Sequence, residues 1–126
     1  MNYRKSLGQS GEAAVATYLK NEGFTVCVLN YQCRAGEIDI IAEKPGLRVF
    51  VEVKTRVSEY FDTSEVVTPT KQRRIISTAC YYNQRQNRIS AEWVYRFDIA
   101  IVHPAGDKFS IRYIPNAFAP SVEYFS

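Results

Sequence analysis

Two neighbouring stretches decide the fold, and they read Gly36-Glu37-Ile38-Asp39-Ile40-Ile41 and Val49-Phe50-Val51-Glu52-Val53-Lys54. Each is short, apolar and rich in β-branched residues, which predicts a buried strand. Both nevertheless contain charged groups, Asp39 in the first and Glu52 and Lys54 in the second. Because an unpaired charge is costly to bury, we expect these three side chains to act together.

Strand alternation predicts where the three side chains lie. In the first strand, Asp39 is expected to share a face with Ile41, and Ile38 and Ile40 are expected on the opposite face. In the second strand, Glu52 and Lys54 share one face and an aliphatic surface lies opposite. The dipeptide at positions 45–46, Pro-Gly, predicts a turn. A hairpin around that turn would bring the three charged groups together.

The rest of the chain predicts an α/β fold with a central mixed β-sheet flanked by helices, in the order αβββαββ. Thr68 is the expected N-cap of the second helix, with Pro69 at its first position. We expect a single domain over 1–126 with its core at about 7–114, a loop at 57–67 and an irregular aromatic tail at 115–126. The expected helices are 7–21 and 69–86, and the expected strands are 24–30, 36–43, 47–56, 93–103 and 109–114.

Composition narrows the class of protein. The net charge of +3 is compatible with a nucleic-acid partner. Three cysteines without a Cys-x-x-Cys pair predict free thiols in a reducing compartment. The N-terminus lacks an apolar signal core and no apolar run approaches the roughly 20 residues of a membrane span, so we expect a cytoplasmic protein that does not enter a membrane.

Two carboxylates held a few ångströms apart repel each other unless a cation or a proton lies between them. Hard oxygen ligands of this kind suit Mg²⁺ or Mn²⁺, and a nearby lysine can orient a water, so Asp39, Glu52 and Lys54 predict metal-assisted hydrolysis of a phosphodiester. Glu12, on the flank of the first helix, is a candidate third ligand or a solvated residue. The alternatives are a buried ion pair of Lys54 with Asp39 or Glu52, and a catalytic lysine of another kind of enzyme.

The second helix carries a basic first half. Lys71, Arg73 and Arg74 lie at the positive end of the helix dipole, which is mildly unfavourable unless an anion such as a phosphate docks there. Ordinary surface charge is the alternative. Gln72 shares the apolar stripe of this helix and is expected to point toward the sheet. In a later strand, Arg96 and Asp98 are expected to form an ion pair, with each other or across strands, that supports the sheet. A direct role at the metal is the alternative.

These motifs resemble those of the YraN-like family, an uncharacterised bacterial family. The resemblance is carried by Gly11-Glu12-Ala13-Ala14, Gly36-Glu37-Ile38-Asp39-Ile40-Ile41-Ala42, Phe50-Val51-Glu52-Val53-Lys54-Thr55-Arg56 and Arg96-Phe97-Asp98. The family is similar to the PD-(D/E)xK nuclease superfamily and, in pattern, to archaeal Holliday junction resolvases. Ile38 stands where the motif name has proline.

The resemblance implies a restriction-endonuclease-like fold and a Mg²⁺- or Mn²⁺-dependent endonuclease acting on nucleic acid, in the first place DNA. It matches Asp39 to the motif aspartate, Glu52 and Lys54 to the E-x-K pair, and Glu12 to the helix glutamate of the resolvases. The Val53 carbonyl is a further candidate ligand. Residues expected to contact nucleic acid are Lys71, Gln72, Arg73, Arg74 and Arg56.

Two further expectations concern assembly and turnover. A homodimer would place two active sites on two strands, and the aromatic tail with Phe118, Tyr124 and Phe125 would either join such an interface or cover its own core. The alternative to a nuclease is a nucleic-acid-binding or interaction module that keeps the fold without turnover.

Overall fold

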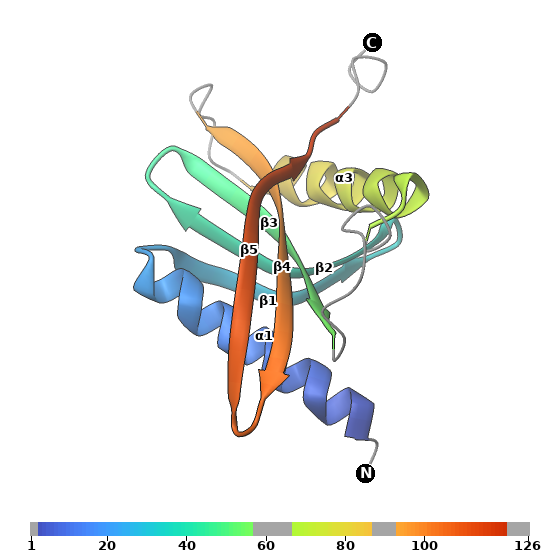
Figure 1. Cartoon of the computed structure of the whole chain (residues 1–126). Helices are drawn as coiled ribbons and strands as arrows, with labels where there is room; N and C mark the ends of the chain where they lie inside the picture. The colour runs from blue at the N-terminus through green and yellow to red at the C-terminus, as the bar shows by residue number, and fades with distance from the viewer. Residues whose placement is uncertain (1–2, 57–66, 87–92, 121–126) are drawn as a thin grey trace.

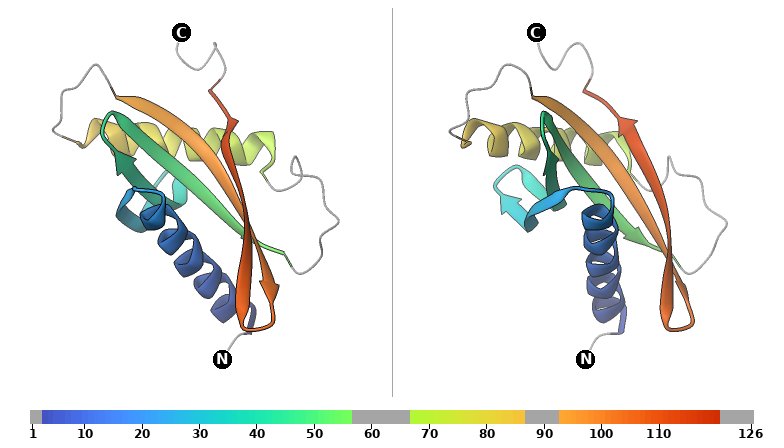
Figure 2. Two further views of the ribbon diagram at one scale, coloured as in Figure 1. Left: turned by 60° about the vertical axis from the view of Figure 1, so that its left-hand side comes forward. Right: turned by 90° about the vertical axis from the view of Figure 1, so that its left-hand side faces the viewer.

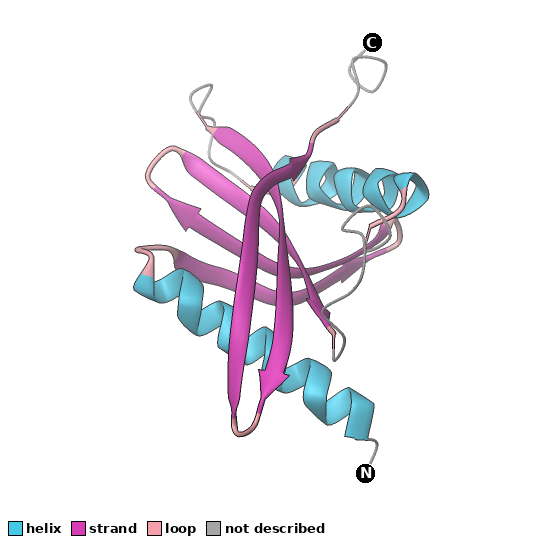
Figure 3. Cartoon of the chain, viewed as in Figure 1, coloured by secondary structure: helices cyan, strands magenta, loops and turns pink. Residues whose placement is uncertain are grey.

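The computed structural model describes residues 3–56, 67–86 and 93–120, with side chains described from Ser10 onward (Figure 1). Within these ranges the helices and strands follow the predicted order αβββαββ (Figure 3). The elements are α1 (Tyr3–Asn21), β1 (Thr25–Cys33), β2 (Gly36–Lys44), β3 (Leu47–Thr55), α3 (Pro69–Gln84), β4 (Val94–Ala105) and β5 (Lys108–Phe118).

The five strands form one mixed sheet in the order β1-β2-β3-β4-β5. β3 and β4 are parallel, and α3 lies between them in the chain, whereas all other neighbours are antiparallel. The β2–β3 hairpin closes where predicted, because Lys44 pairs with Leu47 across the Pro-Gly turn. Gly46 there has φ of 78°, a left-handed conformation that favours glycine.

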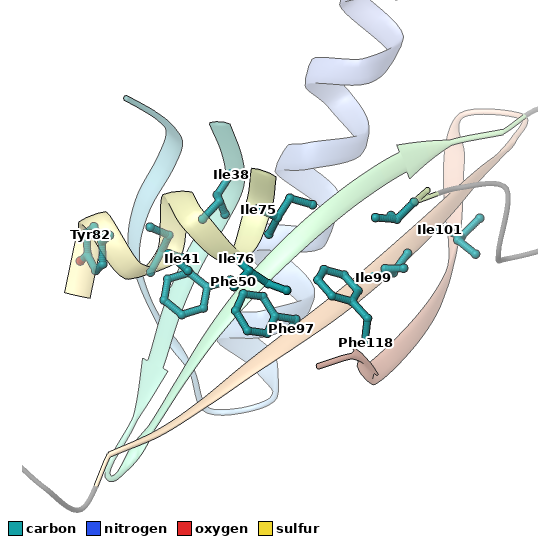
Figure 4. Close-up of a cluster of buried hydrophobic side chains, with 12 residues drawn as sticks. Ile38, Ile41, Phe50, Ile75, Ile76, Tyr82, Phe97, Ile99, Ile101 and Phe118 are labelled. Atoms are coloured by element: carbon teal, nitrogen blue, oxygen red, sulfur yellow. The ribbon is translucent and has the colours of Figure 1, made fainter. Parts of the chain in front are cut away.

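The sheet separates two helices and two cores. α1 crosses one face and α3 covers the other, as the turned views show (Figure 2). The α3-side core contains the aromatic side chains of Phe50, Phe97 and Phe118 against Ile75 and Ile76 (Figure 4). The α1-side core consists mainly of small and aliphatic residues, with Phe24 as a buried aromatic; among them are Val15, Leu19, Val49, Val51, Ala100 and Val102. β3 is therefore buried on both faces, which explains why Val49, Phe50, Val51 and Val53 place apolar side chains on both sides of it.

The start of α3 confirms the prediction made from Thr68-Pro69. Thr68 has an extended backbone, and its Oγ1 accepts a hydrogen bond of 3.3 Å from the amide of Lys71. Pro69 follows as the first helical residue, where its missing N–H has no partner to lose. The cap fixes the position of the first turn of α3.

The ion pair expected in β4 is confirmed and belongs to a larger network. Asp98 is fully buried and accepts two hydrogen bonds of 2.9 Å from the guanidinium of Arg96. The Tyr113 hydroxyl and the amide of Asn116 also donate to its carboxylate. These four donors satisfy a buried charge and attach β5 to β4 on the α1 face.

The C-terminal part of the described chain differs from expectation. β5 continues to Phe118, so 115–118 are not part of an irregular tail. Phe118 pairs with Phe97 across β4–β5, and their rings stack at 5.3 Å, so this ring lies in the core rather than at an interface. Tyr124, Phe125 and most of the expected loop at 57–67 lie outside the described residues.

Two smaller expectations can also be compared with the structure. Cys27, Cys33 and Cys80 are thiols that form no disulfide bond with one another. Within the described ranges, α1 and α3 are too short or too polar to span a bilayer.

Candidate active site

The candidate site forms where β2 separates from β3. Backbone pairing between these strands runs from the turn to Ile40 and Val51. Just beyond the last pair, the Asp39 carboxylate accepts a hydrogen bond of 2.7 Å from the amide of Val53. The Asp39 side chain thus continues the contact between the two strands beyond their backbone pairing. The hydrogen bond holds its carboxylate beside the segment that contains Glu52 and Lys54.

The expected alternation along β2 is wrong at this point. Ile38 and Ile41 both pack in the α3-side core, whereas Ile40 packs in the α1-side core. Two residues that are three apart share a face, so regular alternation is interrupted between them. The interruption coincides with the end of β2–β3 pairing, and it leaves Asp39 beside β3 rather than on one regular face. The alternation expected in β3 is correct, because Phe50 faces α3 and Val49, Val51 and Val53 face α1.

Glu52 is the most buried charge of the site, with 6% of its surface exposed. Its Oε1 atom lies 3.2 Å from the Lys54 ammonium and 2.8 Å from the Lys71 ammonium. Lys54 comes from the same strand, whereas Lys71 comes from the first turns of α3. The buried ion pair between Lys54 and Glu52, which was one alternative to a catalytic site, is therefore present. Lys71 adds a second ammonium to it.

Asp39 has an unusual proton affinity. Burial and the nearby Glu52 charge raise the pKa of its carboxyl to about 7, against the hydrogen bond from the Val53 amide, which lowers it. This carboxyl therefore keeps its proton to a much higher pH than an exposed aspartate does. A carboxyl with such a pKa in a charged site is a recognised mark of functional positions.

Glu12 approaches the cluster from the other side of the sheet. Burial raises the pKa of its carboxyl, the Asn30 side chain hydrogen-bonds to it and lowers the pKa, and Glu52 raises it again. The preceding residue explains how α1 comes so close: a Cβ added to Gly11 would lie 2.6 Å from Thr55 Oγ1. Glycine at this position lets the helix backbone contact the end of β3.

Asp39 and Glu52 fit a divalent cation better than the three-carboxylate set does. Among the residues described, no three His, Cys, Asp or Glu side chains are close enough to hold a metal ion together. Glu12 therefore lies near the pair without completing a ligand group. Mg²⁺ needs only one or two protein carboxylates, with waters filling the other positions. Burial is the larger cause of the raised pKa of Asp39, and repulsion from Glu52 is the second; a bound cation would relieve that repulsion.

The residues expected to contact nucleic acid lie in four different environments. Lys71 contacts Glu52 inside the cluster. The Gln72 amide donates to the Val67 carbonyl at 3.1 Å, so it holds the chain that enters α3. Arg73 and Arg74 are exposed on α3. Arg56 follows β3, and its guanidinium donates to the neighbouring Thr55 carbonyl at 3.0 Å.

A pocket of about 640 Å³ lies next to the charged cluster. It opens between the β1–β2 turn and the first half of α3, and Glu37, Lys71 and Arg74 bring charges to it. The remaining lining residues are Gln32, Cys33, Gly36, Thr68, Thr70 and Ile75. Lys71 thus borders both the pocket and Glu52.

Sequence reasoning missed the place of Lys71 in the carboxylate cluster and the contact of Asn30 with Glu12. One signal could have indicated the first. The helix that follows a strand in a parallel crossover begins near the carboxyl end of that strand, and Lys54 marks that end of β3. No comparable signal exists for Asn30, whose backbone is left-handed with φ of 54°.

Comparison with known proteins identifies the family. Residues 11–102 match the family described as Uncharacterised protein family UPF0102. The chain belongs to this family. It is the YraN-like family that the motifs resemble.

Curated UPF0102 proteins align over most of the chain. One from Geobacter metallireducens is 39% identical over 117 residues, covering 92% of this chain and 94% of its own length. One from Clostridium botulinum strain Loch Maree is 38% identical, with 94% and 98% covered. One from Caldicellulosiruptor saccharolyticus is 41% identical, with 91% and 98% covered. The matched range, residues 11–102, contains the positions of the candidate site residues Glu12, Asp39, Glu52, Lys54 and Lys71.

Proposed function

We propose that this UPF0102 protein is a divalent-metal-dependent nuclease that hydrolyses phosphodiester bonds in DNA. The observation that carries the proposal is the convergence of Asp39, Glu52 and Lys54 where β2 separates from β3. A carboxyl with a pKa near 7 beside a buried carboxylate is an arrangement that a cation would stabilise. The Lys54 ammonium lies 3.2 Å from the Glu52 carboxylate, where it could donate a hydrogen bond to a phosphate or to a water.

The architecture supports a restriction-endonuclease-like fold for this site. The five-stranded mixed sheet has a helix on each face, and a parallel β3–β4 pair at its centre. This matches the flanked mixed sheet that the PD-(D/E)xK resemblance implies. The three residues that correspond to the motif lie on the adjacent strands β2 and β3.

In the proposed reaction, Asp39 and Glu52 would hold a Mg²⁺ or Mn²⁺ ion, with the Val53 carbonyl as a further ligand. Such an ion supplies stabilisation of charge on the phosphate and a bound water that ionises more easily. Lys54 orients the attacking water or donates to a phosphate oxygen. Burial lowers the pKa of its ammonium, which favours proton exchange with that water.

The surroundings of the site support a polyanionic substrate. The pocket beside it is bordered by Lys71 and Arg74, and Arg73 is exposed on the same helix. Phosphates next to the scissile bond would contact these cations, which makes binding strongly dependent on salt. The similarity in pattern to junction resolvases makes branched DNA the first substrate to test, with a role in repair or recombination.

The experiment compares cleavage of four-way, flapped and linear DNA by wild type, Asp39→Asn and Lys54→Ala in Mg²⁺, Mn²⁺ or EDTA. Glu22→Gln and Lys20→Ala are matched controls, because both residues are exposed at the end of α1. This end of the helix lies near Lys44, at the opposite end of β2 from the site, since a Cβ added to Gly23 would lie 3.5 Å from the Lys44 side chain. We expect metal-dependent product from wild type and both controls, reduced at least 100-fold in the two site variants. Equal activity in all five proteins would remove Asp39 and Lys54 from the mechanism.

One observation favours a second candidate, a DNA-binding module without turnover. Two ammonium groups already neutralise Glu52 without a metal, so the site is electrostatically complete by itself. This candidate predicts that labelled DNA binds equally well in EDTA and in Mg²⁺, and that no product forms at any metal concentration.

A further inference from the structure

Lys71 makes the closest contact to the buried carboxylate of the site. Its ammonium lies 2.8 Å from Glu52 Oε1, compared with 3.2 Å for Lys54. Glu52 is almost fully buried, and a buried carboxylate needs a counter-charge. In the protein without metal, much of that counter-charge comes from α3 rather than from the E-x-K motif itself.

The same side chain also has access to solvent and to the pocket. The side chain of Lys71 is 38% exposed, whereas the side chain of Glu52 alone is 7% exposed. Lys71 borders the pocket together with Arg74, on the side of α3 that faces the β1–β2 turn. A lysine has four rotatable bonds in its side chain, so the ammonium can leave the carboxylate and enter the pocket while its backbone stays in the helix.

A divalent cation on Glu52 would compete with this contact. The cation and the Lys71 ammonium would share one carboxylate, and two like charges at that separation repel each other strongly. Lys54 also contacts Glu52, but it follows Glu52 by two residues on the same strand, so its position relative to Glu52 is set by that strand. Lys71 comes from α3 and borders the pocket, so its ammonium has another place to go.

We propose that Lys71 is an exchangeable counter-ion, which neutralises Glu52 in the metal-free protein and is displaced into the pocket when a divalent cation binds. There it meets a phosphate of the nucleic acid beside Arg74. This inference rests on the proposed function, because it assumes that Asp39 and Glu52 hold the cation. It makes Lys71 a positioning residue that couples metal binding to phosphate binding, and such coupling is reciprocal.

The coupling has a signature that a structural role for Lys71 lacks. Removing the ammonium while keeping the aliphatic chain, as in Lys71→Met, removes a competitor of the metal and a contact to the phosphate. Metal affinity should therefore rise while DNA affinity falls. A lysine that only stabilises the fold would weaken both when it is replaced.

The test is a calorimetric titration of Mn²⁺ into wild type, Lys71→Met, Lys71→Arg and the control Lys20→Met, all without DNA. We expect Lys71→Met to bind Mn²⁺ about five- to tenfold more tightly than wild type, and the two other variants to stay within twofold of it. Thermal melts with and without Mn²⁺ accompany the titration, and the stabilisation by Mn²⁺ should be largest for Lys71→Met even if its metal-free form melts earlier.

A second measurement uses a labelled four-way DNA junction in Ca²⁺ and in EDTA, with a gel to check that the DNA stays intact. Ca²⁺ should tighten DNA binding by wild type several-fold more than binding by Lys71→Met. Equal or weaker Mn²⁺ binding by Lys71→Met, with wild type binding normally, would overturn the inference alone. Failure of wild type itself to bind Mn²⁺ would overturn it together with the proposed function.

Discussion

Asp39→Asn should stabilise the metal-free protein at neutral and alkaline pH. The pKa of Asp39 is about 7 in the folded chain, compared with an ordinary value of 3.8. At about 1.4 kcal/mol for each pH unit, ionising this carboxyl is up to about 4 kcal/mol less favourable in the folded chain than in the unfolded one. Asparagine has nearly the same shape, carries no charge and keeps an oxygen for the Val53 amide.

The sign of the effect follows from the protons bound. Well below the ordinary pKa of 3.8, Asp39 is protonated in both states and contributes no difference. Between pH 4 and 7 the folded chain holds more protons than the unfolded chain, so the free energy of unfolding falls as the pH rises. Above pH 7 the full destabilisation remains. Asp39→Asn should therefore match wild type near pH 4 and exceed it by about 2 to 4 kcal/mol at pH 8.

Urea denaturation followed by circular dichroism, in EDTA at pH 4, 6 and 8, measures this difference. The corresponding shift in melting temperature at pH 8 is on the order of 10 °C. Glu22→Gln serves as control, because this exposed glutamate should leave the pH profile unchanged. An Asp39→Asn protein that is less stable than wild type at pH 8, or whose difference from wild type does not vary with pH, would refute the reasoning about Asp39.

Three further predictions concern stability, and each is measured by urea denaturation. Glu52→Gln leaves two ammonium groups facing a neutral amide, so the free energy of unfolding should fall by about 1 to 3 kcal/mol; no loss would show that these ion pairs contribute nothing. Gly11→Ala places a Cβ against Thr55 Oγ1, so the free energy of unfolding should fall by about 1 to 3 kcal/mol. Adding Thr55→Ala should restore much of this loss, and a loss that stays unchanged in the double variant would contradict the contact. Asp98→Ala removes the acceptor of Arg96 and should lose about 3 to 5 kcal/mol, whereas Asp107→Ala in the exposed β4–β5 turn should lose less than about 0.5.

Local patterns were enough to predict the elements of the fold. Alternating apolar residues marked the strands, and Thr68-Pro69 located the start of α3, because these signals depend on residues close together in the chain. The end of β5 could not be predicted in this way. Pro115 and Asn116 resemble a loop, but the strand continues past them, with the Asn116 amide bonded to Asp98 and Phe118 paired with Phe97.

The candidate site was predictable in chemistry but only partly in geometry. Charges inside otherwise apolar strands identified Asp39, Glu52 and Lys54 as candidate site residues, and this inference did not depend on the face of the sheet that each side chain occupies. The orientation of Asp39 depends on where β2 leaves β3, a property of the whole sheet. The contact of Lys71 with Glu52 crosses 19 positions of the chain, and it requires the packing of α3 on the sheet. Neither follows from a pattern along one element.

The central claim is that Asp39 and Glu52 hold a divalent cation. Crystals of the wild-type protein and of Asp39→Asn, both soaked in Mn²⁺ and measured with X-rays that reveal its anomalous scattering, test it most directly. We expect an anomalous peak between the two carboxylates in wild type, with the Lys71 ammonium moved away from Glu52, and a weak or absent peak in the variant. Wild-type crystals at saturating Mn²⁺ with no peak there, and with both lysines still on Glu52, would contradict it.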